Sequence, residues 1–123
     1  MYTLVALAST VPTAMAAAEQ LAADGVDAEV IDLRCLIPLD ARAVLDSVAR
    51  TSRLVVVEEN PYQGGWGATV ASIVAEEAFY DLDAPIRRVA GACVPLPFAA
   101  NLEQAVVPTA DRVTTTVREV MDA

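Results

Sequence analysis

Histidine and lysine are both absent from this chain of 123 residues, and its eight basic residues are all arginine. Without histidine, the sequence cannot form a Ser-His-Asp triad, a Cys-His dyad or a histidine-ligated zinc site. Without lysine, it has no Schiff-base amine and no P-loop lysine for a phosphate. An enzyme built from this chain alone would therefore depend on Asp, Glu, Tyr, Cys and Arg.

Cysteine is scarce, and long hydrophobic runs are missing. Cys35 and Cys93 lie far apart and outside any C-x-x-C motif, which argues against a metal or redox pair and favours a reducing cytoplasm. We expect both to be small packing residues. Although 55% of the residues are hydrophobic, no apolar run approaches the ~20 residues of a membrane span. No basic stretch precedes a small-residue cleavage site, so a secretory signal is not expected.

The charge is strongly of one sign. Seventeen acidic residues against eight basic ones give a formal net charge of −9, and the calculated pI is about 4.2. This balance argues against binding to nucleic acid or to an anionic membrane surface. The length suits one domain with a single core, and no repeat or linker interrupts it, so we expect one domain over residues 1–123.

Hydrophobic patterning predicts that strands and helices alternate along the chain. Strands are expected over residues 2–8, 28–33, 53–58 and 86–90, with a further short one at 106–107. Helices are expected over residues 11–24, 41–50, 68–79, 101–105 and 110–121. This order indicates a three-layer α/β/α fold, with a mostly parallel sheet of four to five strands and helices on both faces. The helix over residues 68–79 is apolar around much of its circumference and is expected to be well buried.

Ligands of an open α/β sheet bind beyond the carboxyl ends of its strands. Glu58 and Glu59 end the third predicted strand and could form an acid/base pair. Alternatively, one carboxylate accepts hydrogen bonds from nearby backbone N–H groups and the other faces solvent. The sequence shows no partner base or nucleophile, which favours the structural interpretation.

A glycine-rich turn, Gly64-Gly65-Trp66-Gly67, follows that strand and leads into a helix. It resembles a phosphate loop, but the spacing is not G-x-G-x-x-G and no G-K-[ST] follows. A tight loop that lets the helix approach its neighbour is the better interpretation. Tyr62, Trp66 and Phe98 are expected on loops, and for Trp66 a partly buried anchor and a protein–protein interface both remain open.

Three parts of the chain, in order and over nearly its whole length, resemble one known family. The matching stretches are residues 28–34 with 38–40, residues 53–59 with 65–68, and residues 84–91 with 95–99. The first follows the pattern V-x-V-I-D-L-R-x-L-x-P-L-D. Together they resemble the C-terminal domain of the β subunit of thiamine-diphosphate-dependent 2-oxoacid dehydrogenase E1 components, in the transketolase C-terminal superfamily.

The resemblance implies a non-catalytic domain for assembly and partner docking. The complete enzyme decarboxylates a 2-oxo acid with thiamine diphosphate and Mg²⁺ and passes the acyl unit to a lipoyl carrier. The cofactor lies on pyrimidine- and diphosphate-binding domains or subunits, so no catalytic, cofactor-binding or metal-binding residue transfers to this chain. The isolated domain is expected to be inactive. Glu58-Glu59 is more like pyruvate-type subunits, whereas Ala8 and the run Gly91-Ala92-Cys93 depart from the family pattern and leave the substrate class open.

The resemblance also implies a docking site for the lipoyl-bearing E2 component. In pyruvate-type relatives, a basic E2 domain meets acidic groups at the turn before the fourth strand and at the C-terminal end. The matching turn here carries Asp81 and Asp83. The matching C-terminal residues are Met121, Asp122 and Ala123. A solvated loop and a frayed tail are the alternative interpretation.

An apolar surface around Trp66, Pro97 and Phe98 is expected to hold a partner subunit or a second copy of the chain as a homodimer. Other functions remain open. The chain could be the separately encoded C-terminal domain of a split transketolase-like enzyme that passes a two-carbon unit to a carrier protein. It could also be a free-standing regulatory module that binds a small molecule, or a hydrolase or lyase that uses Glu58 and Glu59.

Overall fold

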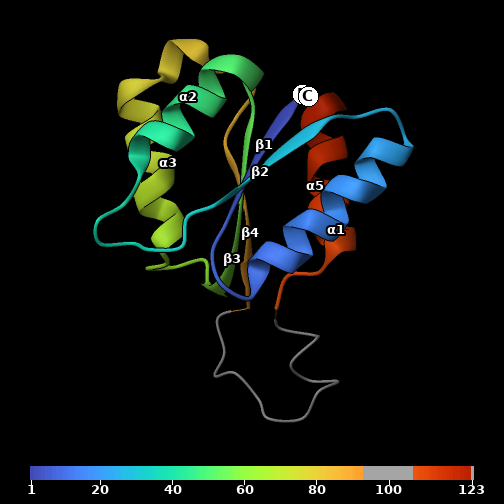
Figure 1. Cartoon of the computed structure of the whole chain (residues 1–123), viewed down its shortest axis with the longest axis horizontal. Coiled ribbons are helices and arrows are strands. Elements are labelled where there is room, and N and C mark those ends of the chain that lie inside the picture. Colours follow the sequence, from blue (N-terminus) through green and yellow to red (C-terminus); the bar gives the residue numbers. More distant parts are fainter. Residues whose placement is uncertain (93–106, 123) are drawn as a thin grey trace.

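The computed structural model describes residues 1–92 and 107–122 of the chain. A four-stranded parallel sheet lies between two layers of helices (Figure 1), which confirms the predicted α/β/α fold. The strands are β1 (Tyr2–Ala6), β2 (Ala28–Asp32), β3 (Leu54–Pro61) and β4 (Arg87–Gly91). The helices are α1 (Thr10–Ala23), α2 (Ala41–Thr51), α3 (Trp66–Glu77), the 3₁₀ turn η1 (Phe79–Asp81) and α5 (Ala110–Asp122).

The strand order is β2-β1-β3-β4, and every neighbouring pair is parallel. From β1 the chain moves outward to β2 and then returns to pair β3 on the other side of β1. The order therefore reverses between β1 and β3, and their carboxyl ends form the switch point of the sheet.

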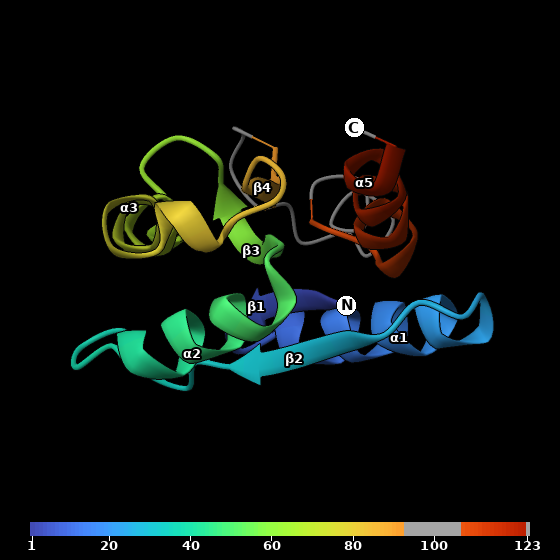
Figure 2. The same ribbon diagram turned by 90° about the horizontal axis from the view of Figure 1, so that it is seen from above.

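Among the described elements, two helices lie on each face of the sheet (Figure 2). Helices α1 and α5 cover one face, where Val55 and Val57 of β3 join the core, and α2 and α3 cover the other, where Leu54 and Val56 do. The period of two along a strand explains this alternation. β1 is buried along its whole length because both of its faces are covered.

Several predicted boundaries are wrong. β1 ends at Ala6 because Ala8 adopts a positive φ of 54° and turns the chain into α1. Thr10 is therefore the first residue of α1, and its hydroxyl lies 2.9 Å from the carbonyl oxygens of both Leu7 and Val57. β3 runs three residues further than predicted, because its register shifts after Val57 and it pairs again with β4 at Pro61.

The burial expected for α3 is also wrong. The helix begins at Trp66, two residues earlier than predicted, and only Gly67, Val70 and Val74 are buried. Its apolar character comes largely from small residues on a side that no other described element covers; Ala68 is one of these exposed residues. None of the helices within residues 1–92 and 107–122 is long and apolar enough to cross a membrane.

Other expectations concern the loops. Cys35 is exposed rather than packed, because the segment between β2 and α2 projects into solvent, with Ile37 91% exposed. Cys93 and the helix expected over residues 101–105 lie outside the described residues. So does Val106 of the expected short strand, and Val107 is not in a strand.

Candidate functional site

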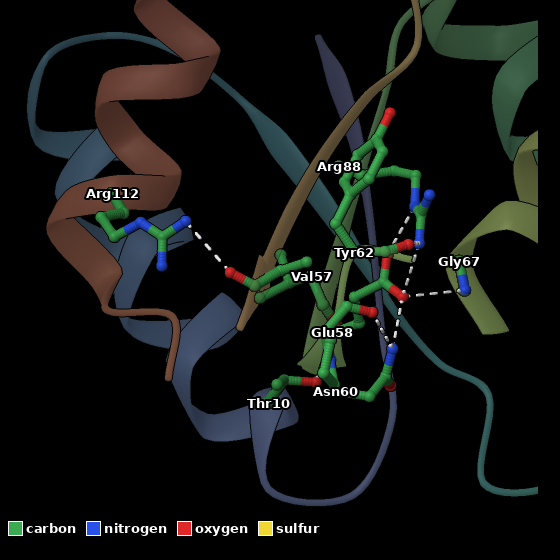
Figure 3. A network of polar contacts seen from close by, with 10 residues as sticks. Thr10, Val57, Glu58, Asn60, Tyr62, Gly67, Arg88 and Arg112 are labelled. Carbon is green, nitrogen blue, oxygen red and sulfur yellow. Dashed lines mark hydrogen bonds and ion pairs between the residues drawn. The ribbon is translucent and has the colours of Figure 1, made fainter. Parts of the chain in front are cut away.

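Glu58 is the most constrained polar residue at the carboxyl end of the sheet. Its side chain is completely buried, at 0% exposure. The carboxylate accepts hydrogen bonds from Nε and Nη2 of Arg88, at 2.7 and 3.0 Å (Figure 3). It also accepts from Asn60 Nδ2 at 2.8 Å and from the backbone N–H of Gly67 at 3.1 Å. Four donors therefore surround one buried carboxylate.

Arg88 reaches this carboxylate from β4, where it is paired in register with Val56. Its side chain is only 8% exposed. Nη2 also donates to the carbonyl oxygen of Tyr62 at 2.7 Å, and the guanidinium carbon lies 4.1 Å from the centre of the Tyr62 ring. Hydrogen bonding to Glu58 raises the pKa of Arg88 above its ordinary value, although burial acts in the opposite direction. The result is a bidentate, charge-assisted ion pair between two strands.

The glycines of the turn make room for this cluster. A Cβ on Gly67 would lie 2.0 Å from Glu58 Oε2, and one on Gly65 would lie 2.0 Å from Asn60 Nδ2. Gly64 adopts a φ of +73°, which a residue with a side chain rarely adopts. The prediction of a tight loop with close helix approach is confirmed, and what the first turn of α3 approaches is the Glu58 carboxylate.

This arrangement does not suit acid–base chemistry. The Glu58 carboxylate is closed to solvent and surrounded by donors, so no substrate can reach it. Glu59 is partly exposed and accepts a hydrogen bond from the Ser9 hydroxyl. The interpretation in which Glu58 accepts from backbone N–H groups is confirmed for Gly67 alone, since the other donors to Glu58 are the side chains of Asn60 and Arg88. Sequence reasoning missed Arg88 as its partner; an arginine directly before the buried pair Val89-Ala90 was the available signal.

The acidic turn expected to dock a partner lies at the other end of the sheet. Asp81 ends η1 and Asp83 follows it, and both are exposed. Neither forms a salt bridge with any residue that the structure describes. The backbone N–H of Asp83 donates to the carbonyl oxygen of Ser52 at 2.8 Å, which ties the turn to the end of α2.

The remaining predicted site residues do not form one cluster. The C-terminal end of α5 and the turn η1 both lie at the end of the sheet where the strands begin (Figure 1). Met121, in the last turn of α5, is 45% exposed. Asp122 is the last residue of α5. Trp66 opens α3 near the opposite end of the sheet and is not on a loop; it packs partly buried against the core, as expected of an anchor. Pro97, Phe98 and Ala123 lie outside the described residues.

Comparison with known proteins shows the family. Residues 2–113 match the model of the transketolase C-terminal domain. The chain belongs to this family.

The family's curated members that are similar to this chain include β subunits of pyruvate dehydrogenase. The pyruvate dehydrogenase E1 component subunit beta of Rickettsia felis is 48% identical over 118 residues, which are 96% of this chain and 36% of the relative. The mitochondrial subunit beta-1 of Arabidopsis thaliana is 50% identical over 106 residues, 86% of this chain and 29% of the relative. The subunit beta of Leifsonia xyli is 50% identical over 111 residues, which are 90% of this chain and 33% of the relative. The chain thus spans about a third of the length of these relatives, and the resemblance drawn from the sequence is confirmed.

Proposed function

We propose that this chain is the C-terminal domain of the β subunit of a pyruvate-type 2-oxoacid dehydrogenase E1 component. In this proposal the complete enzyme decarboxylates the 2-oxo acid and passes the acyl unit to a lipoyl carrier. The domain itself contributes assembly and docking and no reacting group. The observation that carries the proposal is 48% identity to a pyruvate dehydrogenase β subunit over 96% of this chain but only 36% of that subunit.

The residues present do not fit thiamine diphosphate or its metal ion. A diphosphate would need the open N–H groups of a glycine-rich turn at a helix start. Here the Gly67 N–H already donates to the buried Glu58 carboxylate and is not open to a phosphate oxygen. No group of three or more acidic or cysteine side chains that could hold a metal ion occurs among residues 1–92 and 107–122. In this proposal the cofactor site lies on the pyrimidine- and diphosphate-binding domains or subunits that complete the enzyme.

The partners follow from the same proposal. The chain associates with the other domains or subunits of E1, and the acidic turn at Asp81 and Asp83, with the C-terminal residues Met121 to Ala123, docks a basic domain of E2 in the cytoplasm. Exposure of both aspartates without a salt-bridge partner among the described residues supports this role. Attraction between opposite charges would then speed association and weaken as salt rises.

The experiment uses the complete E1 that contains this chain, with two activities measured side by side. One is pyruvate oxidation with an artificial electron acceptor, and the other is acyl transfer to E2. Asp81→Asn with Asp83→Asn should weaken E2 capture about tenfold or more at low salt and leave the acceptor-dye activity unchanged. Glu19→Gln, an exposed carboxylate on α1, is the matched control.

Two results would contradict the proposal. Pyruvate turnover by the isolated chain would place catalytic groups in this domain. Equal E2 capture by the double variant, Glu19→Gln and the wild type would remove the docking assignment. Turnover of a ketose phosphate in place of pyruvate would instead support the split transketolase-like enzyme.

A further inference from the structure

An apolar groove opens beside the acidic turn, between η1 and the start of β4. Its volume is about 560 Å³, and its lining includes Phe79, Tyr80, Leu82, Pro85 and Ile86. Phe79 is 62% exposed and Tyr80 is 97% exposed. Their rings meet edge to face with centroids 5.4 Å apart. Two adjacent aromatic rings left in solvent at a groove are typical of a protein contact rather than of a free surface.

Backbone hydrogen bonds order the turn that carries these rings. The N–H of Asp81 donates to the carbonyl oxygen of Ala78 at 3.0 Å, and the N–H of Leu82 donates to that of Phe79 at 3.2 Å. The bond from Asp83 to Ser52 anchors the turn to α2. Because the backbone is already ordered, a partner would bind this groove with little loss of conformational entropy in η1.

Asp83 lines the groove, and three more carboxylates lie within seven residues of it along the chain. Glu76 and Glu77 end α3, and Asp81 and Asp83 follow within the next turn; all four are exposed. None forms a salt bridge with a residue in the described part of the chain. Carboxylates at the C-terminal end of a helix are unfavourable because the helix dipole is negative there. The charges of Glu76 and Glu77 therefore do not stabilise α3, whereas a cationic partner would be attracted to them.

The charges also decide between possible occupants. A second copy of this chain would bring four more carboxylates to the same face, and like charges across an interface are strongly unfavourable. A basic segment places opposite charges there instead. An apolar side chain on that segment would fill the space between the aromatic rings and Pro85.

We infer that the groove lined by Phe79 and Tyr80 receives one apolar side chain of a basic partner segment, whose flanking arginines or lysines meet Asp83 and the neighbouring exposed carboxylates. This inference rests on the proposed function and deepens it, since the segment belongs to the domain that docks at Asp81 and Asp83. The two parts of the contact act on different rates. The carboxylates steer association, whereas the desolvated apolar contact slows dissociation.

The test measures binding of the E2 component to complete E1 containing this chain, with association and dissociation rates resolved at two salt concentrations. Phe79→Ser and Tyr80→Ser should raise the dissociation rate about tenfold, as truncation of an aromatic anchor does, and leave the salt dependence unchanged. Asp81→Asn and Asp83→Asn should lower the association rate and reduce its salt dependence. Ile37→Ser is the matched control, because Ile37 is 91% exposed and lies on the loop between β2 and α2.

A photoreactive residue in place of Tyr80 gives an independent readout. It should crosslink to an apolar residue of E2 that has arginine or lysine within a few positions on either side. Crosslinking to a second copy of this chain, or to an acidic segment, would overturn the inference.

The outcomes separate this inference from the proposed function. If the aspartate variants weaken binding and the aromatic variants match Ile37→Ser, the groove assignment is wrong and the docking role stands. If neither pair changes binding, both are wrong. If both pairs weaken binding through the same rate, the division of roles between charge and groove is wrong.

Discussion

Replacing Arg88 with methionine tests whether the buried ion pair holds the carboxyl end of the sheet together. Arg88→Met keeps most of the aliphatic volume but removes the guanidinium. The Glu58 carboxylate, which is 0% exposed in the wild type, then loses two of its four hydrogen bonds, while those from Asn60 and the Gly67 N–H remain. The Tyr62 carbonyl oxygen also loses its donor.

The magnitude follows from leaving a buried charge without its counter-ion. Removal of one partner of a buried pair typically costs about 3–5 kcal/mol of the free energy of unfolding. Because two donors to Glu58 remain, we expect a loss near the lower limit, about 3 kcal/mol. With an m value of about 1.5–2 kcal/mol/M in urea, the unfolding midpoint should fall by about 1.5–2 M.

The assay is equilibrium unfolding in urea, followed by far-UV circular dichroism and by the fluorescence of Trp66, the single tryptophan. Arg87→Met is the matched control. Arg87 is the preceding residue of the same strand, and its salt bridge to Glu119, 2.9 Å long, is solvent-exposed on both sides. An exposed pair contributes about 0–1 kcal/mol, so this control should change the midpoint little.

A double-mutant cycle identifies the cause of the loss. Glu58→Gln keeps an acceptor for the Gly67 N–H and removes the charge. If the pair is coupled as the geometry implies, Glu58→Gln with Arg88→Met should be at least about 2 kcal/mol more stable than the sum of the single losses predicts. Additive losses, or a loss for Arg88→Met no larger than for Arg87→Met, would refute the reasoning.

Three further predictions concern the same molecule. Gly67→Ala should lower the free energy of unfolding by about 1–3 kcal/mol, because the new Cβ would meet Glu58 Oε2 at 2.0 Å. Ala68→Ser, at an exposed position, should change the free energy of unfolding by less than about 0.5 kcal/mol, and urea unfolding compares the two variants. Thr3→Val should lower the free energy of unfolding by about 1–3 kcal/mol, because the buried Thr3 hydroxyl forms hydrogen bonds with the hydroxyls of Ser47 and Thr51 at 2.7 and 2.6 Å. A smaller loss, measured by thermal unfolding, would mean that the Ser47 and Thr51 hydroxyls find other partners. The pKa of Arg88 is raised in the folded state, so the stabilisation that Arg88 contributes is fully present below the ordinary arginine pKa and is lost only as pH rises through the higher folded pKa. The difference in free energy of unfolding between wild type and Arg88→Met should therefore be equal at pH 7 and pH 9.5, as measured by urea unfolding.

Local sequence was sufficient wherever one element decides its own structure. Four strands and four helices of the described part follow from apolar periodicity. Asp40, a preferred N-cap residue directly before α2, accepts a hydrogen bond from the Ala43 N–H. Sequence was insufficient around residues 58–66. The strand predicted from the pattern ends at residue 58, but pairing with β4 keeps Pro61 in the strand.

The charges show the same division. Asp24, directly after α1, forms a salt bridge with Arg118, which lies 94 residues further along the chain. Glu58 and Arg88 are separated by 30 residues, and nothing between them marks the pair. Both pairs depend on which strands and helices become neighbours, and that is set by the strand order rather than by local propensity.

The sequence by itself determined the fold class, the family and the lack of histidine and lysine chemistry, because composition, periodicity and motif order are written along the chain. Tertiary structure alone decided that Glu58 is a buried anchor held by Arg88, that glycines lie where its carboxylate needs space, and that Phe79 and Tyr80 stand exposed beside four carboxylates. The physical reason is that burial, pairing and exposure depend on contacts between elements distant in sequence, and the parallel sheet with its reversed strand order creates those contacts.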